Sequence, residues 1–138
     1  MSFSPEPVTI FVPGPLRNPL NGSRGVWQKH ARWARQWRER AGTAFLVERQ
    51  RRFGKWPWPP EAPKRITFLA QTWATWDDDA LRAGLKPIRD AVRDARIVVD
   101  DAPKWGHEWV YAQVINRGHR GVMITIEVLP SPDSSPLV

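Results

Sequence analysis

The sequence contains no cysteine, so it can form neither a disulfide nor a thiolate metal site. It has no run of ~18 apolar residues, and we expect no membrane-spanning helix. The first residues, MSFSPEPVTIF, lack the basic and apolar regions of a signal peptide. No internal repeat and no glycine-rich phosphate loop is found. These absences fit a cytoplasmic protein, which is where we expect this one to act.

Acidic residues are scarce in the first half of the chain. Between Arg17 and Arg65 there are thirteen lysines and arginines against three glutamates, and the 138 residues together carry a net charge of +7. Such an excess indicates an anionic partner, of which nucleic acid is the commonest. A basic protein without any such partner is the alternative.

The order of the segments predicts a single α+β domain over residues 1–129, followed by a flexible tail over 130–138. A mixed sheet packed by two main helices, in the order β-α-β-α-(β)-β-β, is expected. The predicted strands are 8–12, 65–76, 108–115 and 122–129, the last two joined as a hairpin, with 97–103 as the optional strand. The predicted helices are 26–52 and 81–96, the second kinked or restarted at Pro87.

The first predicted helix has an apolar stripe and a separate basic band. The stripe consists of Trp33, Trp37, Ala41, Ala44 and Phe45 at near-helical spacing. Few acids stand among the arginines to pair with them, so we expect contacts to DNA phosphates, which position DNA without reading its bases. A solvated helix face is the alternative. The predicted DNA-binding residues of this region are Arg17, Arg24, Lys29, Arg32, Arg35 and Arg38.

Three adjacent aspartates, Asp77, Asp78 and Asp79, follow the predicted strand 65–76. On an extended backbone residues i and i+2 point to the same side, so Asp77 and Asp79 would converge while Asp78 faces away. Converging carboxylates repel each other unless a cation lies between them, and Mg²⁺ favours oxygen ligands. Asp100 and Asp101 end a second apolar run and would join them if the two runs lie side by side.

Such a cluster would hydrolyse phosphodiesters, since Mg²⁺ activates water and stabilises the leaving oxygen. Lys86 lies seven residues after Asp79, on the same face of a continuous helix, and could orient the phosphate. The alternative is structural: the three aspartates could cap a helix, and Asp100 and Asp101 could form a turn.

Residues 76–105, WDDDALRAGLKPIRDAVRDARIVVDDAPKW, resemble the core motif of the RusA-type Holliday junction resolvases, in the longer-spaced form of phage members. That motif runs D-x-D-N-L, a spacer, K and often P, a helix with an aspartate, and an apolar stretch ending in D-D. Here Asp77 and Asp79 match the first acids, Lys86 the lysine, and Asp90 the helix acid. Asp100 and Asp101 match the final pair.

The resemblance implies a homodimeric endodeoxyribonuclease that makes paired symmetric nicks in Holliday junctions and other branched DNA, in recombination and repair. It further implies Mg²⁺, for which Mn²⁺ can substitute, and a bacterial or phage-infected cell. The metal-binding acids would be Asp77, Asp79 and Asp101, with Asp100 as a helper. The catalytic lysine would be Lys86.

One position departs from the family motif. Ala80 stands where the family has asparagine, whose amide could orient a carboxylate or a water. Its loss favours the alternative function, a catalytically weak or inactive protein that binds branched DNA.

Tryptophan is abundant, with nine residues. Trp56 and Trp58, in a proline-rich stretch, could stack on unpaired bases or lock the loop against the sheet, and burial is favoured. Trp105 and Trp109 are expected beside the acidic site or in a dimer interface. None of the three histidines has metal-ligand spacing to another. His107 is close to Asp101 in the sequence and could approach the phosphate, but a surface position is favoured.

Overall fold

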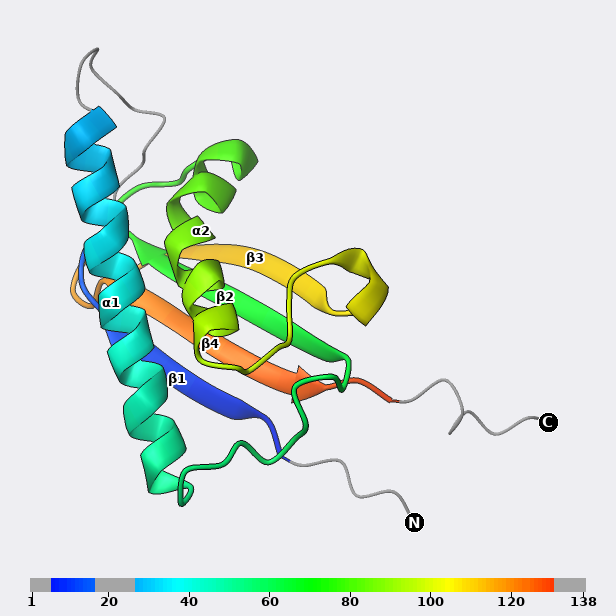
Figure 1. Ribbon diagram of the computed structural model, residues 1–138. Helices are drawn as coiled ribbons and strands as arrows, with labels where there is room; N and C mark the ends of the chain where they lie inside the picture. Colours follow the sequence, from blue (N-terminus) through cyan, green and yellow to red (C-terminus); the bar gives the residue numbers. More distant parts are fainter. Residues whose placement is uncertain (1–5, 17–26, 131–138) are drawn as a thin grey trace.

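The computed structural model describes residues 6–16 and 27–130. It contains one four-stranded sheet and two long helices (Figure 1). The elements are β1 (Val8–Pro13), α1 (Trp27–Arg51), β2 (Lys64–Thr72), α2 (Asp78–Asp94), a 3-10 helix η1 (Pro103–Trp105), β3 (Glu108–Ile115) and β4 (Gly121–Val128). The predicted α+β domain with a mixed sheet and two main helices is therefore confirmed. Most of the predicted tail, 131–138, lies outside the described residues.

The strands are arranged in the order β1-β4-β2-β3. Strand β4 pairs antiparallel with β1 and with β2, whereas β3 pairs parallel with β2. The predicted hairpin of the last two strands is therefore wrong, because β2 lies between them. Residues 116–120 instead cross the end of β2, where the Asn116 amide donates to the Thr72 carbonyl at 3.0 Å. Local sequence could not reveal this, since both arrangements need a short polar connection.

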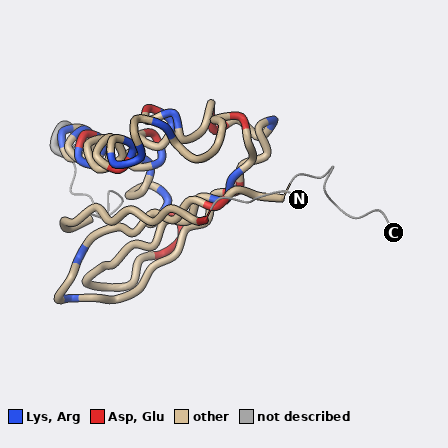
Figure 2. The backbone as a smooth tube through the Cα atoms, turned by 90° about the horizontal axis from the view of Figure 1, so that it is seen from below, with Lys and Arg blue, Asp and Glu red and all other residues tan. Residues whose placement is uncertain are grey.

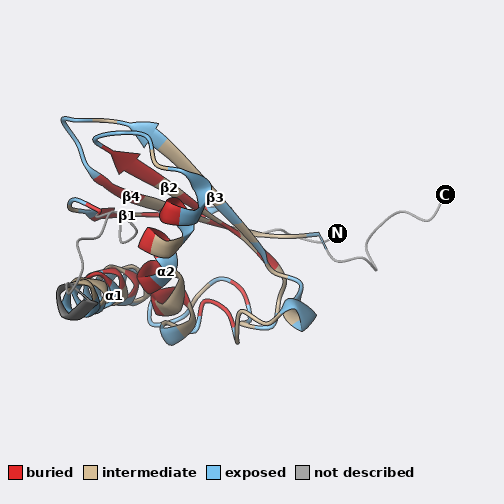
Figure 3. Cartoon of the chain, turned by 90° about the horizontal axis from the view of Figure 1, so that it is seen from above, coloured by how far each residue is buried: buried red, intermediate tan, exposed pale blue. Residues whose placement is uncertain are grey.

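Both helices cover the same face of the sheet (Figure 3). From α1 the buried side chains are Trp37, Ala41 and Phe45, while Trp33 and Ala44 of the predicted stripe are half-buried. Helix α2 contributes Leu81, Leu85, Ile88 and Val92. They pack on alternate residues of the central strands, such as Ile66, Phe68, Ile124 and Ile126. The alternation of side chains along a strand directs these residues to the helical layer.

Two element boundaries differ from the predictions. Strand β2 ends at Thr72, four residues early, and Thr72 Oγ1 donates to the Ala74 carbonyl at 2.9 Å, which turns the chain away. Helix α2 begins at Asp78, three residues early, because Asp77 caps it. Pro87 lies within one continuous helix. The optional strand is absent, and 97–102 form a non-strand connection that leads into η1.

The proline-rich connection before β2 is held against the domain, as its tryptophans were predicted to be. Trp58 is buried and its ring stacks on Trp56 at a centroid distance of 5.7 Å. Trp56 Nε1 donates to the carbonyl of Ala95 at 3.0 Å, which ties this loop to the end of α2. Of the helices that the structure describes, none combines the length and apolar character needed to cross a bilayer.

Candidate nucleic-acid interface

The three adjacent aspartates lie at the start of α2, not at the end of a strand. Asp77 is the N-cap, and its Oδ1 accepts from the Ala80 amide at 2.9 Å. Asp78 and Asp79 occupy the first turn, and all three are exposed. The predicted convergence of Asp77 and Asp79 on an extended backbone is therefore wrong, because residues i and i+2 do not share a face once the helix has begun. The positive end of the helix stabilises these charges instead.

Asp100 and Asp101 belong to the connection after α2 and face arginines in the second half of that helix. Asp101 Oδ2 is 3.4 Å from Arg89 Nε, and Asp100 Oδ1 is 3.9 Å from an Arg93 guanidinium nitrogen. Arg89 follows Asp79 by ten residues, which is about 15 Å along a helix axis. The two apolar runs therefore do not bring their acids together, since the second run is not a strand beside β2. Partial burial opposes the charge of Asp101, but hydrogen bonding with Asp100 and the charge of Arg89 lower its pKa.

This separation bears directly on the predicted Mg²⁺ site. Within 6–16 and 27–130, no three His, Cys, Asp or Glu side chains lie close enough together to hold a metal ion. Asp77 accepts from the Ala80 amide as a cap and Asp101 faces Arg89, so in this arrangement each of these two acids already has a partner. We therefore derive no chemical step through a metal from this geometry.

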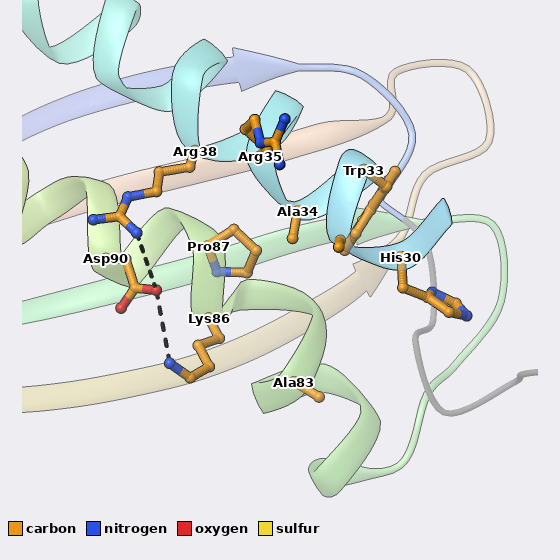
Figure 4. A pocket seen from close by; sticks show the side chains of 10 residues that line it. His30, Trp33, Ala34, Arg35, Arg38, Ala83, Lys86, Pro87 and Asp90 are labelled. Atoms are coloured by element: carbon orange, nitrogen blue, oxygen red, sulfur yellow. Dashed lines mark ion pairs between the residues drawn. The ribbon is translucent and has the colours of Figure 1, made fainter. Parts of the chain in front are cut away.

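Lys86 projects from the middle of α2 and borders two grooves. The interhelical groove, about 510 Å³, lies between α1 and α2 and is lined by His30, Trp33, Arg35, Arg38, Lys86 and Asp90, among others. Figure 4 shows the Asp90 carboxylate between Lys86 and Arg38, at 3.7 and 4.0 Å respectively. The lysine side chain is 72% exposed, so it remains accessible to a ligand.

The second groove, the α2–β3 groove, brings Lys86 and Asp101 together. It measures about 310 Å³ and is lined by Arg82, Ala83, Lys86, Arg89, Asp90, Asp101 and Tyr111. Three motif residues thus share one groove, Lys86, Asp90 and Asp101, whereas Asp77 and Asp79 lie outside its lining. Three cations against two carboxylates leave the groove with an excess of positive charge, which suits an anionic ligand.

Sequence reasoning missed the residues that complete this groove. Arg89 donates to the Tyr111 hydroxyl at 2.7 Å, and its guanidinium lies 4.2 Å from the centre of the Trp109 ring. Arg82 lies over the Tyr111 ring at 5.1 Å. A signal was available, because Arg82, Lys86 and Arg89 are spaced i, i+4 and i+7 on one helix face. The predicted place of Trp105 and Trp109, beside the acidic site or in a dimer interface, stays a prediction.

The basic band on α1 is described only in part. Arg17 and Arg24 lie outside the described residues, and so does the side chain of Lys29. Arg32 and Arg35 are exposed. Figure 2 shows basic positions along both helices.

Arg38 does have an acidic partner, contrary to the expectation from its neighbours in the sequence. It donates to both oxygens of Asp94 on α2, at 2.6 and 2.8 Å. This bidentate pair raises the pKa of Arg38 and lowers that of Asp94. Arg38 is therefore partly neutralised and joins the two helices, which leaves Arg32 and Arg35 as the freer cations of this face.

His107 is half-buried rather than a surface residue. Its Nδ1 accepts from the Lys64 backbone amide at 3.1 Å, and burial together with the charge of Lys64 lowers its pKa. A neutral imidazole held in this way supports the start of β2 and contacts neither groove.

A scan against models of known protein families found no family that matches the chain, and a search of curated proteins found no matching relative.

Proposed function

We propose that this protein is a structure-selective endodeoxyribonuclease that nicks four-way junctions and other branched DNA. The observation that carries the proposal is that Lys86 and Asp90 of α2 line one groove together with Asp101, which follows Asp90 by eleven residues, and that this groove has an excess of positive charge. Arg35 extends this surface across the interhelical groove, so a DNA backbone could follow both helices. The exposed Asp77–Asp79 segment lies at the N-terminal end of α2, the helix that carries Lys86 and Asp90.

The resemblance adds three requirements to the proposal. The enzyme would need Mg²⁺ or Mn²⁺, would act as a homodimer, and would work in the cytoplasm of a bacterial or phage-infected cell. Two symmetric nicks are most simply made by two related active sites, which a two-fold dimer supplies. Light scattering of the purified protein, alone and with junction DNA, tests for the dimer.

Cleavage of a synthetic junction, with a linear duplex of the same length beside it, tests the activity. We expect nicks in the junction with Mg²⁺ or Mn²⁺ and none with a chelator. Asp79→Asn and Lys86→Met should abolish cutting while junction binding survives. Asp78→Asn is the matched control, because it removes the same charge from the adjacent exposed position and should still cut. A junction left intact in both metals would contradict the proposal.

The second candidate is a non-cleaving protein that binds branched DNA. Two observations favour it. Asp101 faces Arg89 rather than the other acids. Ala80 is buried and lacks the side-chain amide of the family's asparagine, which could orient a carboxylate or a water. Tight junction binding that needs no divalent metal and yields no product would select this candidate. Equal, weak binding to junction and duplex would instead leave only a basic domain with capping acids.

A further inference from the structure

A second cluster of cations and an aromatic ring lies away from both grooves, at the end of the sheet where β2 and β3 finish. Trp73 follows β2 directly, and its side chain is 56% exposed. The guanidinium carbons of Arg117 and Arg120, from the connection between β3 and β4, lie 5.1 and 5.9 Å from the Trp73 ring centre. Figure 1 shows the segment after β2 and this connection at the same end of the sheet.

The backbone holds this cluster in place. Asn116 donates to the Thr72 carbonyl at 3.0 Å, and Gly14 donates to the Arg120 carbonyl at 3.1 Å. Arg117 Nε also donates to the Trp73 carbonyl at 3.4 Å. The connection is thus tied to β2 on one side and to the residue that follows β1 on the other. An exposed ring on such a support loses little conformational freedom when a ligand stacks on it.

The charges of this cluster are unbalanced. Among the residues that the structure describes, no carboxylate lies within 4.0 Å of either guanidinium. Two like charges beside one ring repel each other, and the ring alone offsets this only in part. An anion that approached both arginines would relieve the repulsion. The cluster therefore offers an apolar face for a planar group and cations for a negative group beside it.

We propose that Trp73, Arg117 and Arg120, here called the Trp73 platform, bind a nucleotide of single-stranded or unpaired DNA. The base stacks on the indole, and its flanking phosphate pairs with the arginines. Arg120 lies farther from the Trp73 ring than Arg117 does, and we expect its guanidinium to leave the ring and contact the phosphate when the nucleotide binds. This inference takes only its ligand class, DNA, from the proposed function and needs neither metal nor cleavage.

The position of the platform gives it a place in the proposed reaction. Trp73 precedes Asp77 by four residues, so their Cα atoms are at most about 14 Å apart. At a branch point the arms end without a continuous stack, so a base there is more easily unstacked than one inside a linear duplex. A base held on Trp73 would position the branch point near the start of α2, and the platform would thereby favour branched over linear DNA.

Binding of a fluorescent oligothymidylate of twelve nucleotides, measured by anisotropy in a chelator, tests the platform. Trp73→Ala should weaken this binding roughly 5- to 150-fold, the range for the loss of one stacked base. Arg117→Gln and Arg120→Gln should weaken it and flatten its salt dependence. Binding of a blunt duplex should not change in Trp73→Ala. Phe53→Ala is the matched control, because Phe53 is 97% exposed but lies elsewhere, after α1.

The outcomes separate this inference from the proposed function. Unchanged single-strand binding in Trp73→Ala, with an unchanged melting temperature, would overturn the proposal. The two arginines would then only pack against the Trp73 ring, without a role in DNA binding. An equal loss in Phe53→Ala would overturn it too. Trp73-dependent binding in a protein that cuts no junction would support the platform while the nuclease proposal fails.

Discussion

At the scale of single residues, Lys64 shows how a cation can be buried in this domain. Its side chain is fully buried, and Nζ donates to the carbonyls of Pro59, Pro60 and Ala62 at 3.0, 3.1 and 2.8 Å. The Trp58 ring centre lies 5.8 Å from the same nitrogen. The Pro59 carbonyl also accepts from the Ala62 amide at 3.1 Å, so this turn and Lys64 together hold the connection before β2.

Burial of Lys64 predicts a rise in stability at alkaline pH. Burial lowers its pKa from 10.5 to about 8, so the unfolded chain binds more protons than the folded chain between these values. The free energy of unfolding should therefore increase from about pH 8 to about pH 10.5, and this gain is lost as the pH falls to 8. Urea denaturation across this window measures it. Lys64→Met should remove the slope, and Lys55→Met, at an exposed lysine, should keep it.

Asp77 allows its structural role to be separated from its proposed catalytic role. Asp77→Ala removes the cap of α2 and should lower the free energy of unfolding by about 0.5–2 kcal/mol. Asp77→Asn keeps a side-chain oxygen for the Ala80 amide and should cost far less. If Asp77 also serves catalysis, both variants lose junction cleavage, although only the alanine variant is destabilised. Denaturation beside the cleavage assay distinguishes these results, and full cleavage by Asp77→Asn would leave Asp77 as a cap alone.

At the scale of elements, the ion pair between the two helices predicts unequal roles for neighbouring arginines. Arg38 is held by Asp94, whereas Arg35, on the same helix and beside the same groove, is exposed without such a clamp. Arg35→Gln should therefore weaken junction binding more than Arg38→Gln at the same salt concentration. Arg38→Gln should instead reduce stability by up to about 1 kcal/mol, the range for exposed ion pairs. Equal losses of affinity would show that Asp94 releases Arg38 when DNA binds.

The elements themselves were largely predictable from the sequence, because their patterns are local. The apolar stripe of α1 and the alternating strands identified most elements to within a few residues. Pairing was not predictable in the same way. Strand β4 inserts between β1 and β2, and nothing in 116–120 distinguishes a hairpin from a connection across β2. The convergence of Asp77 and Asp79 failed because it depended on a strand reaching residue 76, whereas the chain turns at Thr72.

The residues that sequence reasoning missed are those whose meaning depends on contacts between elements. Arg89 gains its place from Tyr111 and Asp101, and Trp73 gains its place from Arg117, 44 positions later. No local pattern encodes such pairs. Lys86, by contrast, was predicted as a site residue from the motif. The interhelical groove and the α2–β3 groove that it borders were not predicted.

At the scale of the whole molecule, the net charge of +7 predicts that salt weakens DNA binding, and the number of phosphate contacts sets how strongly. Each phosphate that the protein neutralises releases counterions, so the logarithm of the binding constant falls with the logarithm of salt concentration by about 0.9 for each duplex contact. Arg32, Arg35, Arg82 and Lys86 are exposed cations on the helical layer. A duplex bound across this layer should therefore show a slope of roughly −3 to −4 from these four contacts.

The salt slope of single variants measures how much each residue contributes to it. Arg35→Gln and Lys86→Met should each reduce its magnitude by about 1, because each removes one phosphate contact. Arg65→Gln provides the matched control, since Arg65 donates to Glu108 at 2.8 Å on the sheet and should leave the slope unchanged. If every arginine variant, Arg65 included, lowered the slope equally, binding would follow net charge alone. A loss confined to the helical layer would instead locate the DNA on α1 and α2, beside Lys86 and Asp90 of the motif.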